Sequence, residues 1–276
     1  MKQGAGSKRG VGAALHDSAI NALSVRKSFD RAGAGYDAFA ELQAIARTSL
    51  LHRLDRITAA PPRVVLDAGA GTGLASHALT CRYPMGQVIA LDSALGMLRA
   101  SGCQQSWVQS FHRVCADAEH LPLADASVDL ILSNLMLQWC DLDAVFAEFR
   151  RVLAPRGSIS FSTLGPDTLH ELRAAWAEVD SHSHVNRFIN VHEVRAAMLR
   201  AGFTAPMLDV ERHTLTYADV RGLAADLKGI GAHNMTAGRP KGLTGPRKFA
   251  AMQAAYETFR REGRLPATYE VIFGQA

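Results

Sequence analysis

Three glycines, Gly69, Gly71 and Gly73, follow a short apolar run in the stretch VVLDAGAGTG. Glycine lets the backbone turn tightly there and lets a ligand approach the main chain. The dinucleotide fingerprint is G-x-G-x-x-G, whereas the spacing here is G-x-G-x-G with Asp67 just before the loop. An acid at the loop entrance suits a ligand with an amino group, such as a methionine moiety. The spacing therefore predicts a cofactor loop and argues against an NAD oxidoreductase.

Two further aspartates stand at the ends of the next two predicted strands. Asp92 ends the run QVIALD, where a carboxylate can accept hydrogen bonds from both hydroxyls of a ribose. Asp117, followed by Ala118, ends the run at 112–117 and is placed beside an adenine edge. Each aspartate alone could equally cap a helix or a turn. Three acids at three consecutive strand ends, together with the loop, resemble the S-adenosylmethionine-dependent methyltransferase fold.

Short β-branched runs alternate with helical patterns through the middle of the chain, and they predict strands at 63–68, 87–92, 112–117, 128–134 and 158–164. Apolar residues at helical spacing from Leu142 to Leu153 predict a helix between the last two, which the stretch APRG ends. Nearly continuous apolar strands that alternate with helices are typical of a parallel sheet covered on both faces. Two later runs, 207–217 and 267–273, suit the far edge, the last of them antiparallel.

The fold class predicted from these elements is α/β: a Rossmann-like class I methyltransferase with a seven-stranded, mostly parallel sheet, helices on both faces and a helical lid. Residues 1–24 are predicted to be a flexible leader, because they are basic and glycine-rich without an apolar region. Residues 25–276 are predicted to form a single methyltransferase domain. We expect the segments at about 28–58, 166–203 and 218–264 to lie near the carboxyl ends of the strands as a lid.

Composition excludes some classes of protein. Hydrophobic residues make up 48% and charged residues 20% of the 276 residues, as in an ordinary globular chain, and no apolar run is long enough to span a bilayer. The four cysteines have no metal spacing and predict reduced thiols in the cytoplasm. The histidines at 182, 184 and 192 lack partner ligands, so no metal is expected. A net charge of +4 is too small to indicate nucleic-acid binding.

Motifs outside the cofactor loop narrow the resemblance. The chain is similar to the malonyl-acyl-carrier-protein O-methyltransferases of biotin synthesis over about residues 24–275, in the stretches FDRAGAGYDAFAELQ, SNLMLQWC, DTLHELRAAWAEVD, NRF, LKGIGAHN and TYEVIFG. The resemblance implies S-adenosylmethionine as cofactor. It implies methyl transfer to the free carboxylate of malonyl-acyl-carrier protein or malonyl-CoA, which starts pimelate synthesis. Ala70 stands where the family loop often has Cys, an exchange between small residues.

The same resemblance assigns residues outside the loop. Arg187, in HVNRF, is expected to orient the substrate carboxylate, and Phe188 either walls the acyl pocket or packs under the lid. Tyr36 and Gln43 are expected to cover cofactor and substrate, and Asn134 to line the cofactor site. A carboxylic acid with a pKa of roughly 4 is already ionised at neutral pH, so this chemistry needs no general base. The alternative for Arg187 is a solvated surface charge.

A cluster of cations without an acid lies in GRPKGLTGPRK, at Arg239, Lys241, Arg247 and Lys248. It is either a solvated loop or a docking surface for the acidic carrier protein, where charge mainly speeds encounter.

Other functions stay open. A complex I assembly factor with hydroxylase or scaffold activity shares parts of three motifs, and a methyltransferase of another small carboxylate or metabolite would keep the cofactor site. In the metabolite case His170 or His184 could serve as a base. A nucleic-acid amine methyltransferase is disfavoured, because such enzymes usually carry N-P-P-aromatic where this chain has SNLMLQW, which contains no proline.

Overall fold

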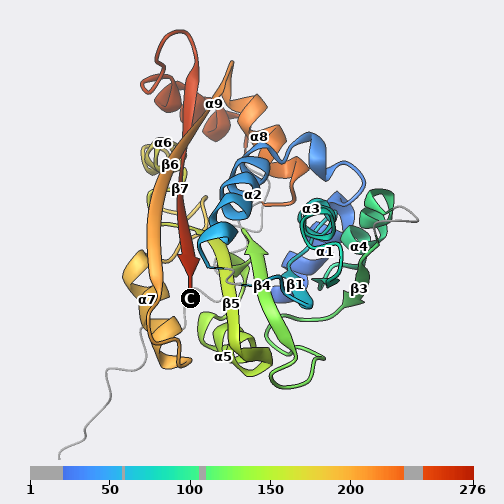
Figure 1. Ribbon diagram of the computed structural model, residues 1–276. Coiled ribbons are helices and arrows are strands. Elements are labelled where there is room, and N and C mark those ends of the chain that lie inside the picture. Colours follow the sequence, from blue (N-terminus) through green and yellow to red (C-terminus); the bar gives the residue numbers. More distant parts are fainter. Residues whose placement is uncertain (1–20, 58–59, 106–109, 233–244) are drawn as a thin grey trace, which may run out of the picture.

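The computed structural model describes residues 21–57, 60–105, 110–232 and 245–276, which form one seven-stranded sheet with helices on both sides (Figure 1). The sheet order is β3-β2-β1-β4-β5-β7-β6. The strands are β1 Val64–Ala68, β2 Gln87–Asp92, β3 His112–Cys115, β4 Val128–Asn134, β5 Leu153–Leu164, β6 Met207–Tyr217 and β7 Leu265–Gln275. The predicted α/β fold and the places of its strands in the chain are confirmed, although β3 is two residues shorter than expected and β5 and β7 are longer.

The order in which strands are added to the sheet reverses at β1, which pairs in parallel with β2 on one side and with β4 on the other. In sheets of this kind a ligand binds outside the carboxyl ends of the strands at the point of reversal. The last strand, β7, runs antiparallel between β5 and β6, as the sequence predicted. The glycine loop therefore leaves β1 at the point where the topology opens a crevice.

The helices in chain order are α1 Ala22–Ala32, α2 Glu41–Arg53, α3 Leu74–Arg82, α4 Leu95–Ala100, α5 Leu142–Val152, α6 His170–Ala177, α7 Val191–Arg200, α8 Val220–Gly229 and α9 Pro246–Glu257, with a short 3₁₀ turn, η1, at Tyr36–Ala38. The prediction that Leu153 belongs to the helix before β5 is wrong. Leu153 pairs with Val128 at the start of β5, and the APRG stretch forms the irregular part of that strand before the next pairing.

Two apolar layers cover the sheet, because neighbouring residues of each strand face opposite sides. Val65 belongs to a layer with residues of α2, α3, α6, α8 and α9, whereas Leu66 belongs to a layer with residues of α5 and α7. Helix α7 contacts α5 and β6. This part of the segment 166–203 therefore covers the sheet instead of its ligand-binding edge.

Helices α8 and α9, from the segment 218–264, lie towards the carboxyl ends of the parallel strands (Figure 1). In Figure 1, α8 and α9 lie at the top of the view, beyond the end of β4. Helix α1 starts at Ala22, so residues 22–24 of the predicted leader are helical, and 1–20 lie outside the described residues. Within the described part of the chain, no helix has both the length and the hydropathy needed to cross a membrane.

Candidate functional site

The glycine loop has the backbone that its sequence predicted. Gly69, Gly71 and Gly73 have φ values of 74°, 55° and 81°, in the left-handed region that side chains disfavour. A Cβ atom on Gly69 would lie 2.5 Å from Cγ of Met136, whereas Gly71 faces open space. The loop is held to β2 because the N–H groups of Gly69 and Ala70 both donate to the carbonyl of Leu91. It thus requires glycine for conformation and for close approach.

Asp92 joins the loop to the end of β2. Its Oδ2 accepts from the N–H of Gly71 at 2.9 Å, and its Oδ1 accepts from the N–H of Ala94 at 2.8 Å. Burial raises the pKa of this carboxyl above its ordinary value, and the two backbone hydrogen bonds oppose the rise. Each carboxylate oxygen has a further lone pair, so Asp92 can still accept from a ligand hydroxyl.

A cleft of about 280 Å³, here named the strand-end cleft, opens over these strand ends. It gathers most of the predicted cofactor residues, namely Tyr36, Gly69, Gly71, Asp92, Asp117, Ala118 and Asn134. Helix α1 covers it with Val25, Arg26 and Phe29, which the sequence analysis did not assign. Only the motif beginning at Phe29 pointed to this region. The edge of the Phe29 ring meets Trp139, with ring centroids 5.6 Å apart.

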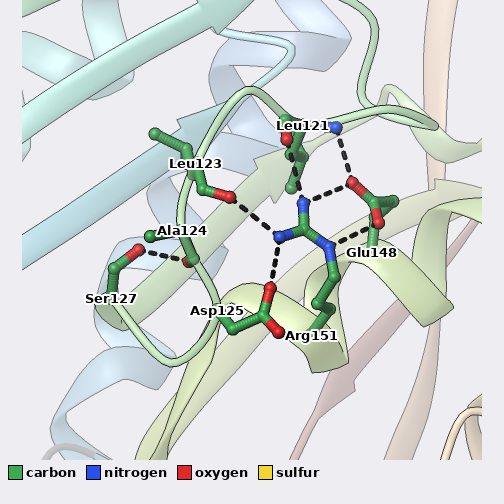
Figure 2. Close-up of polar contacts among 7 residues, drawn as sticks. All are labelled: Leu121, Leu123, Ala124, Asp125, Ser127, Glu148 and Arg151. Carbon is green, nitrogen blue, oxygen red and sulfur yellow. Dashed lines mark hydrogen bonds and ion pairs between the residues drawn. The ribbon is translucent and has the colours of Figure 1, made fainter.

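The turn after β3 carries Asp117 and Ala118, and the loop that follows this turn is held by hydrogen bonds to α5. Asp117 Oδ1 accepts from the N–H of Glu119 at 3.0 Å. Figure 2 shows Arg151 of α5 donating to the carbonyls of Leu121 and Leu123 and to the carboxylates of Asp125 and Glu148. This network holds the loop that follows the cleft-lining residues.

A second cavity of about 210 Å³, the glycine-loop cavity, adjoins the cleft at Tyr36, Gly69, Gly71 and Asn134. Asp67 lines it and accepts from Oγ of Ser76 at 2.5 Å. Burial raises the pKa of the Asp67 carboxyl to about 7, while the Ser76 hydrogen bond opposes the rise. Gln43 Oε1 is buried here without a hydrogen-bond partner among the described residues. A carboxyl group and an orphaned carbonyl oxygen are acceptors that suit an ammonium group, as an amino-acid-bearing cofactor requires.

A third cavity of about 50 Å³, the lid cavity, lies against the second and shares Tyr36 and Gln43 with it. Asn186 and Phe188 line it, together with the apolar residues Phe29, Leu42, Leu135, Leu164, Leu169, Leu227 and Ile230. No Asp, Glu, His, Lys or Arg side chain lines it among the residues that the structure describes. The predicted pair Tyr36 and Gln43 therefore stands where the cofactor cavities meet a mostly apolar chamber.

Arg187 does not line any of these three cavities, although its two neighbours in sequence line the lid cavity. Its side chain is exposed and makes no hydrogen bond or ion pair with the described residues. Its role toward a substrate carboxylate stays a prediction.

His184 packs on the ring of Trp176, with centroids 3.7 Å apart, and its Nε2 lies 2.8 Å from Oδ1 of Asp180.

The predicted docking cations are placed only in part. Arg239 and Lys241 lie outside the described residues. Arg247 is exposed at the start of α9, and Lys248 pairs with Asp180 at 2.9 Å.

Comparisons with known proteins agree with this geometry. The methyltransferase-domain family matches residues 66–161. The chain is 54% identical to a malonyl-acyl-carrier protein O-methyltransferase of Methylovorus sp., over 93% of this chain and 89% of that protein. It is 49% identical to the enzyme of the same name from Gallionella capsiferriformans, over 95% and 92% of the two chains. The crystal structure of the YcgJ protein of Bacillus has a TM-score of 0.59 at 18% identity, covering 83% of this chain and 97% of that one, and shows the shared fold.

The glycine loop, the acids at the strand ends and the acceptors for an ammonium group fit S-adenosylmethionine as the methyl donor. The strand-end cleft suits its adenosine part, and the glycine-loop cavity suits its amino-acid end. Given this site and the identity to relatives over nearly their whole length, the chain belongs to the malonyl-acyl-carrier protein O-methyltransferase family of S-adenosylmethionine-dependent methyltransferases.

Proposed function

We propose that this enzyme methylates the free carboxylate of malonyl-acyl-carrier protein, or of malonyl-CoA, to give the malonyl methyl ester that starts pimelate synthesis for biotin. The observation that carries the proposal is the composition of the lid cavity, which adjoins the cofactor cavities and has no Asp, Glu, His, Lys or Arg side chain among its described lining residues. A malonyl carboxylate with a pKa of roughly 4 needs no base, whereas a hydroxyl or carbon acceptor does.

The chain contributes positioning and exclusion of water. When bound, S-adenosylmethionine supplies a methyl group on a sulfonium sulfur, which leaves as a neutral thioether without any proton transfer. Tyr36 and Gln43 line both the glycine-loop cavity and the lid cavity, so they can align donor and acceptor. Alignment of this kind supplies roughly 7–11 kcal/mol in favourable cases. The apolar wall around Phe188 keeps water from the carboxylate.

Arg187 is the residue proposed to orient the substrate carboxylate. The stretch that carries it contributes Asn186 and Phe188 to the lid cavity, and its guanidinium has no partner among the described residues. Arginine can grip two carboxylate oxygens at once. Acetyl thioesters have no free carboxylate, so this contact would also select malonyl over acetyl groups.

The test of the activity uses purified protein, S-adenosylmethionine labelled in the methyl group, and malonyl-acyl-carrier protein. A labelled ester that alkali hydrolyses is expected, and acetyl-acyl-carrier protein should stay unlabelled. Base-stable label would favour methylation of another group. Cofactor binding without any labelled product would favour the scaffold role of the assembly-factor alternative.

Arg187 is tested with the Arg187→Ala variant beside Arg221→Ala, an exposed arginine of α8 that lines none of the three cavities. We expect Arg187→Ala to lower kcat/KM for malonyl-acyl-carrier protein by about tenfold or more, because a charged hydrogen bond contributes about 1.5–3 kcal/mol. Cofactor affinity should not change. Turnover equal to that of Arg221→Ala would show that Arg187 does not orient the substrate carboxylate.

The partner surface is proposed to include Arg239, Lys241, Arg247 and Lys248, where an acidic carrier protein would find cations. Reversing Arg247 and Lys248 to Glu should raise KM for carrier-bound malonate much more than KM for malonyl-CoA. Asp180→Asn serves as the control, because it removes the ion pair with Lys248 and keeps all four cations. Equal changes for both substrates would contradict docking.

We also propose that the protein is cytoplasmic, since its four cysteines are free.

A further inference from the structure

One cation of the cofactor site has no role in the function proposed so far. Arg47 lies on α2 one turn after Gln43, and its side chain lines the glycine-loop cavity with Asp67 and Tyr36. Residues four apart on a helix share a face, so α2 presents Gln43 and Arg47 to the same cavity. The residue is half-buried, and no described residue pairs with it or accepts a hydrogen bond from it.

The two acids that line this cavity with Arg47 each accept a hydrogen bond from another donor. Asp37, which also lines the cavity, accepts from Oγ1 of Thr72 at 2.6 Å, and Asp67 accepts from Ser76. Burial raises the pKa of Asp67 and of Tyr36, and the Arg47 guanidinium opposes the rise in both. The cavity thus has an acid on the wall from β1 and a cation without a partner on the wall from α2.

We propose that Arg47 binds the carboxylate of the cofactor's amino-acid end, opposite the ammonium that Asp67 and Gln43 Oε1 accept. An α-amino acid carries one group of each charge on a single carbon, and the two walls present the complementary pair. The planar guanidinium can donate two parallel hydrogen bonds to a carboxylate.

The position of Arg47 separates this role from binding of the methyl acceptor. Arg47 lines the glycine-loop cavity and does not line the lid cavity, where the acceptor carboxylate is proposed to lie. The inference therefore concerns how the methyl donor is held, and it stands whether or not malonyl is the acceptor.

The test compares two ligands that differ only at the amino-acid end. S-adenosylhomocysteine has this end, whereas methylthioadenosine keeps the nucleoside and the sulfur but lacks it. Isothermal titration measures the Kd of both ligands for the wild type, Arg47→Gln, Arg47→Lys and Arg56→Gln. Arg56 is an exposed arginine shortly after α2 that lines none of the three cavities, so its variant is the matched control.

We expect Arg47→Gln to weaken S-adenosylhomocysteine binding by about tenfold or more and to leave methylthioadenosine within about twofold. Arg47→Lys should retain part of the affinity, because it keeps the charge without the fork. Thermal unfolding of each variant checks that the chain is folded. Equal losses for both ligands, or no loss for S-adenosylhomocysteine, would overturn the inference, and neither result depends on the malonyl substrate.

Discussion

The glycine-loop cavity and the lid cavity adjoin at Tyr36 and Gln43, but the chain builds them in different ways. The first is lined almost entirely by two short stretches, 36–47 and 67–75, and backbone hydrogen bonds and positive φ values hold the second stretch in place. The second is lined by side chains that range from Phe29 to Tyr269. Backbone geometry shapes the proposed donor side, whereas packing of distant, mostly apolar residues shapes the proposed acceptor side.

The two regions also differ in charge. The glycine-loop cavity contains Asp67, Asp37 and Arg47, whereas the described lining of the lid cavity is neutral. Fixed charges suit a cofactor that carries the same zwitterionic end in every cycle. A neutral, mostly apolar wall suits an acceptor that arrives already ionised, because it excludes water and any competing base. Variants should therefore affect donor binding and acceptor binding separately.

The largest expected effect is at Gly69. Gly69→Ala would place a Cβ in a backbone with φ of 74° and within 2.5 Å of Cγ of Met136. Strain and displacement of this kind cost about 1–3 kcal/mol, so cofactor affinity should fall by on the order of 100-fold in titration calorimetry. The control is Gly202→Ala, at φ of 92° with open space and outside the three cavities, which should lower stability alone. Unchanged affinity in Gly69→Ala would mean that the loop does not define the donor site.

On the acceptor side, Phe188→Ala removes a wall of a cavity of only about 50 Å³. We expect KM for the malonyl thioester to rise about tenfold, because lost apolar contact costs about 1.5 kcal/mol or more and water gains access. Cofactor Kd should stay within about twofold. Leu199→Ala, on the exposed side of α7, is the control. A parallel loss of cofactor affinity would show that the two regions are not separable.

The charged glycine-loop cavity contains an acid, Asp67, whose protonation should make the stability of the protein depend on pH. Burial raises the pKa of its carboxyl to about 7 from 3.8, so the folded protein keeps a proton that the unfolded chain has lost between these values. Its contribution to the free energy of unfolding is therefore present below pH 3.8 and is lost as the pH rises through about 7. In Asp67→Asn this contribution no longer varies with pH.

The affinity for the ligand should also depend on protonation of the Asp67 carboxyl, but it should increase as the pH rises. An ammonium group prefers the ionised carboxylate, so wild-type affinity for S-adenosylhomocysteine should rise about tenfold from pH 6 to pH 8. Asp67→Asn should bind with little pH dependence over this range. Calorimetric titrations at the two pH values measure both. The same pH dependence of affinity in Asp67→Asn would mean that another group is responsible for it.

The smallest expected effect is at Arg151, which supports the cleft only through the loop after β3 (Figure 2). Arg151→Ala removes hydrogen bonds that contribute about 1 kcal/mol each to stability, and it should weaken cofactor binding only two- to threefold, or by about 0.5 kcal/mol. Thermal unfolding and titration measure the two effects. A loss as large as that of Gly69→Ala would mean that the loop, and not the glycines, limits affinity.

Much of the donor site was predictable because its signals are local. The glycine spacing, Asp67 before the loop and the aspartates at successive strand ends are patterns over a few residues, and parallel strands bring their carboxyl ends to one edge. The residues of the proposed acceptor side were predicted only through family resemblance. Its lining residues lie far apart in sequence and carry no spacing rule.

Patterns within short segments were enough to predict the α/β sheet, its early strands and the glycine loop, because hydrophobic periodicity and glycine spacing are local signals. Packing between distant segments instead fixes the start of α1 at Ala22, its position over the cleft, and the contact of α7 with α5. It also placed Arg47 in the cavity of Asp67 and left Arg187 exposed. These positions depend on how separate helices pack against the sheet, which no pattern within a single segment encodes.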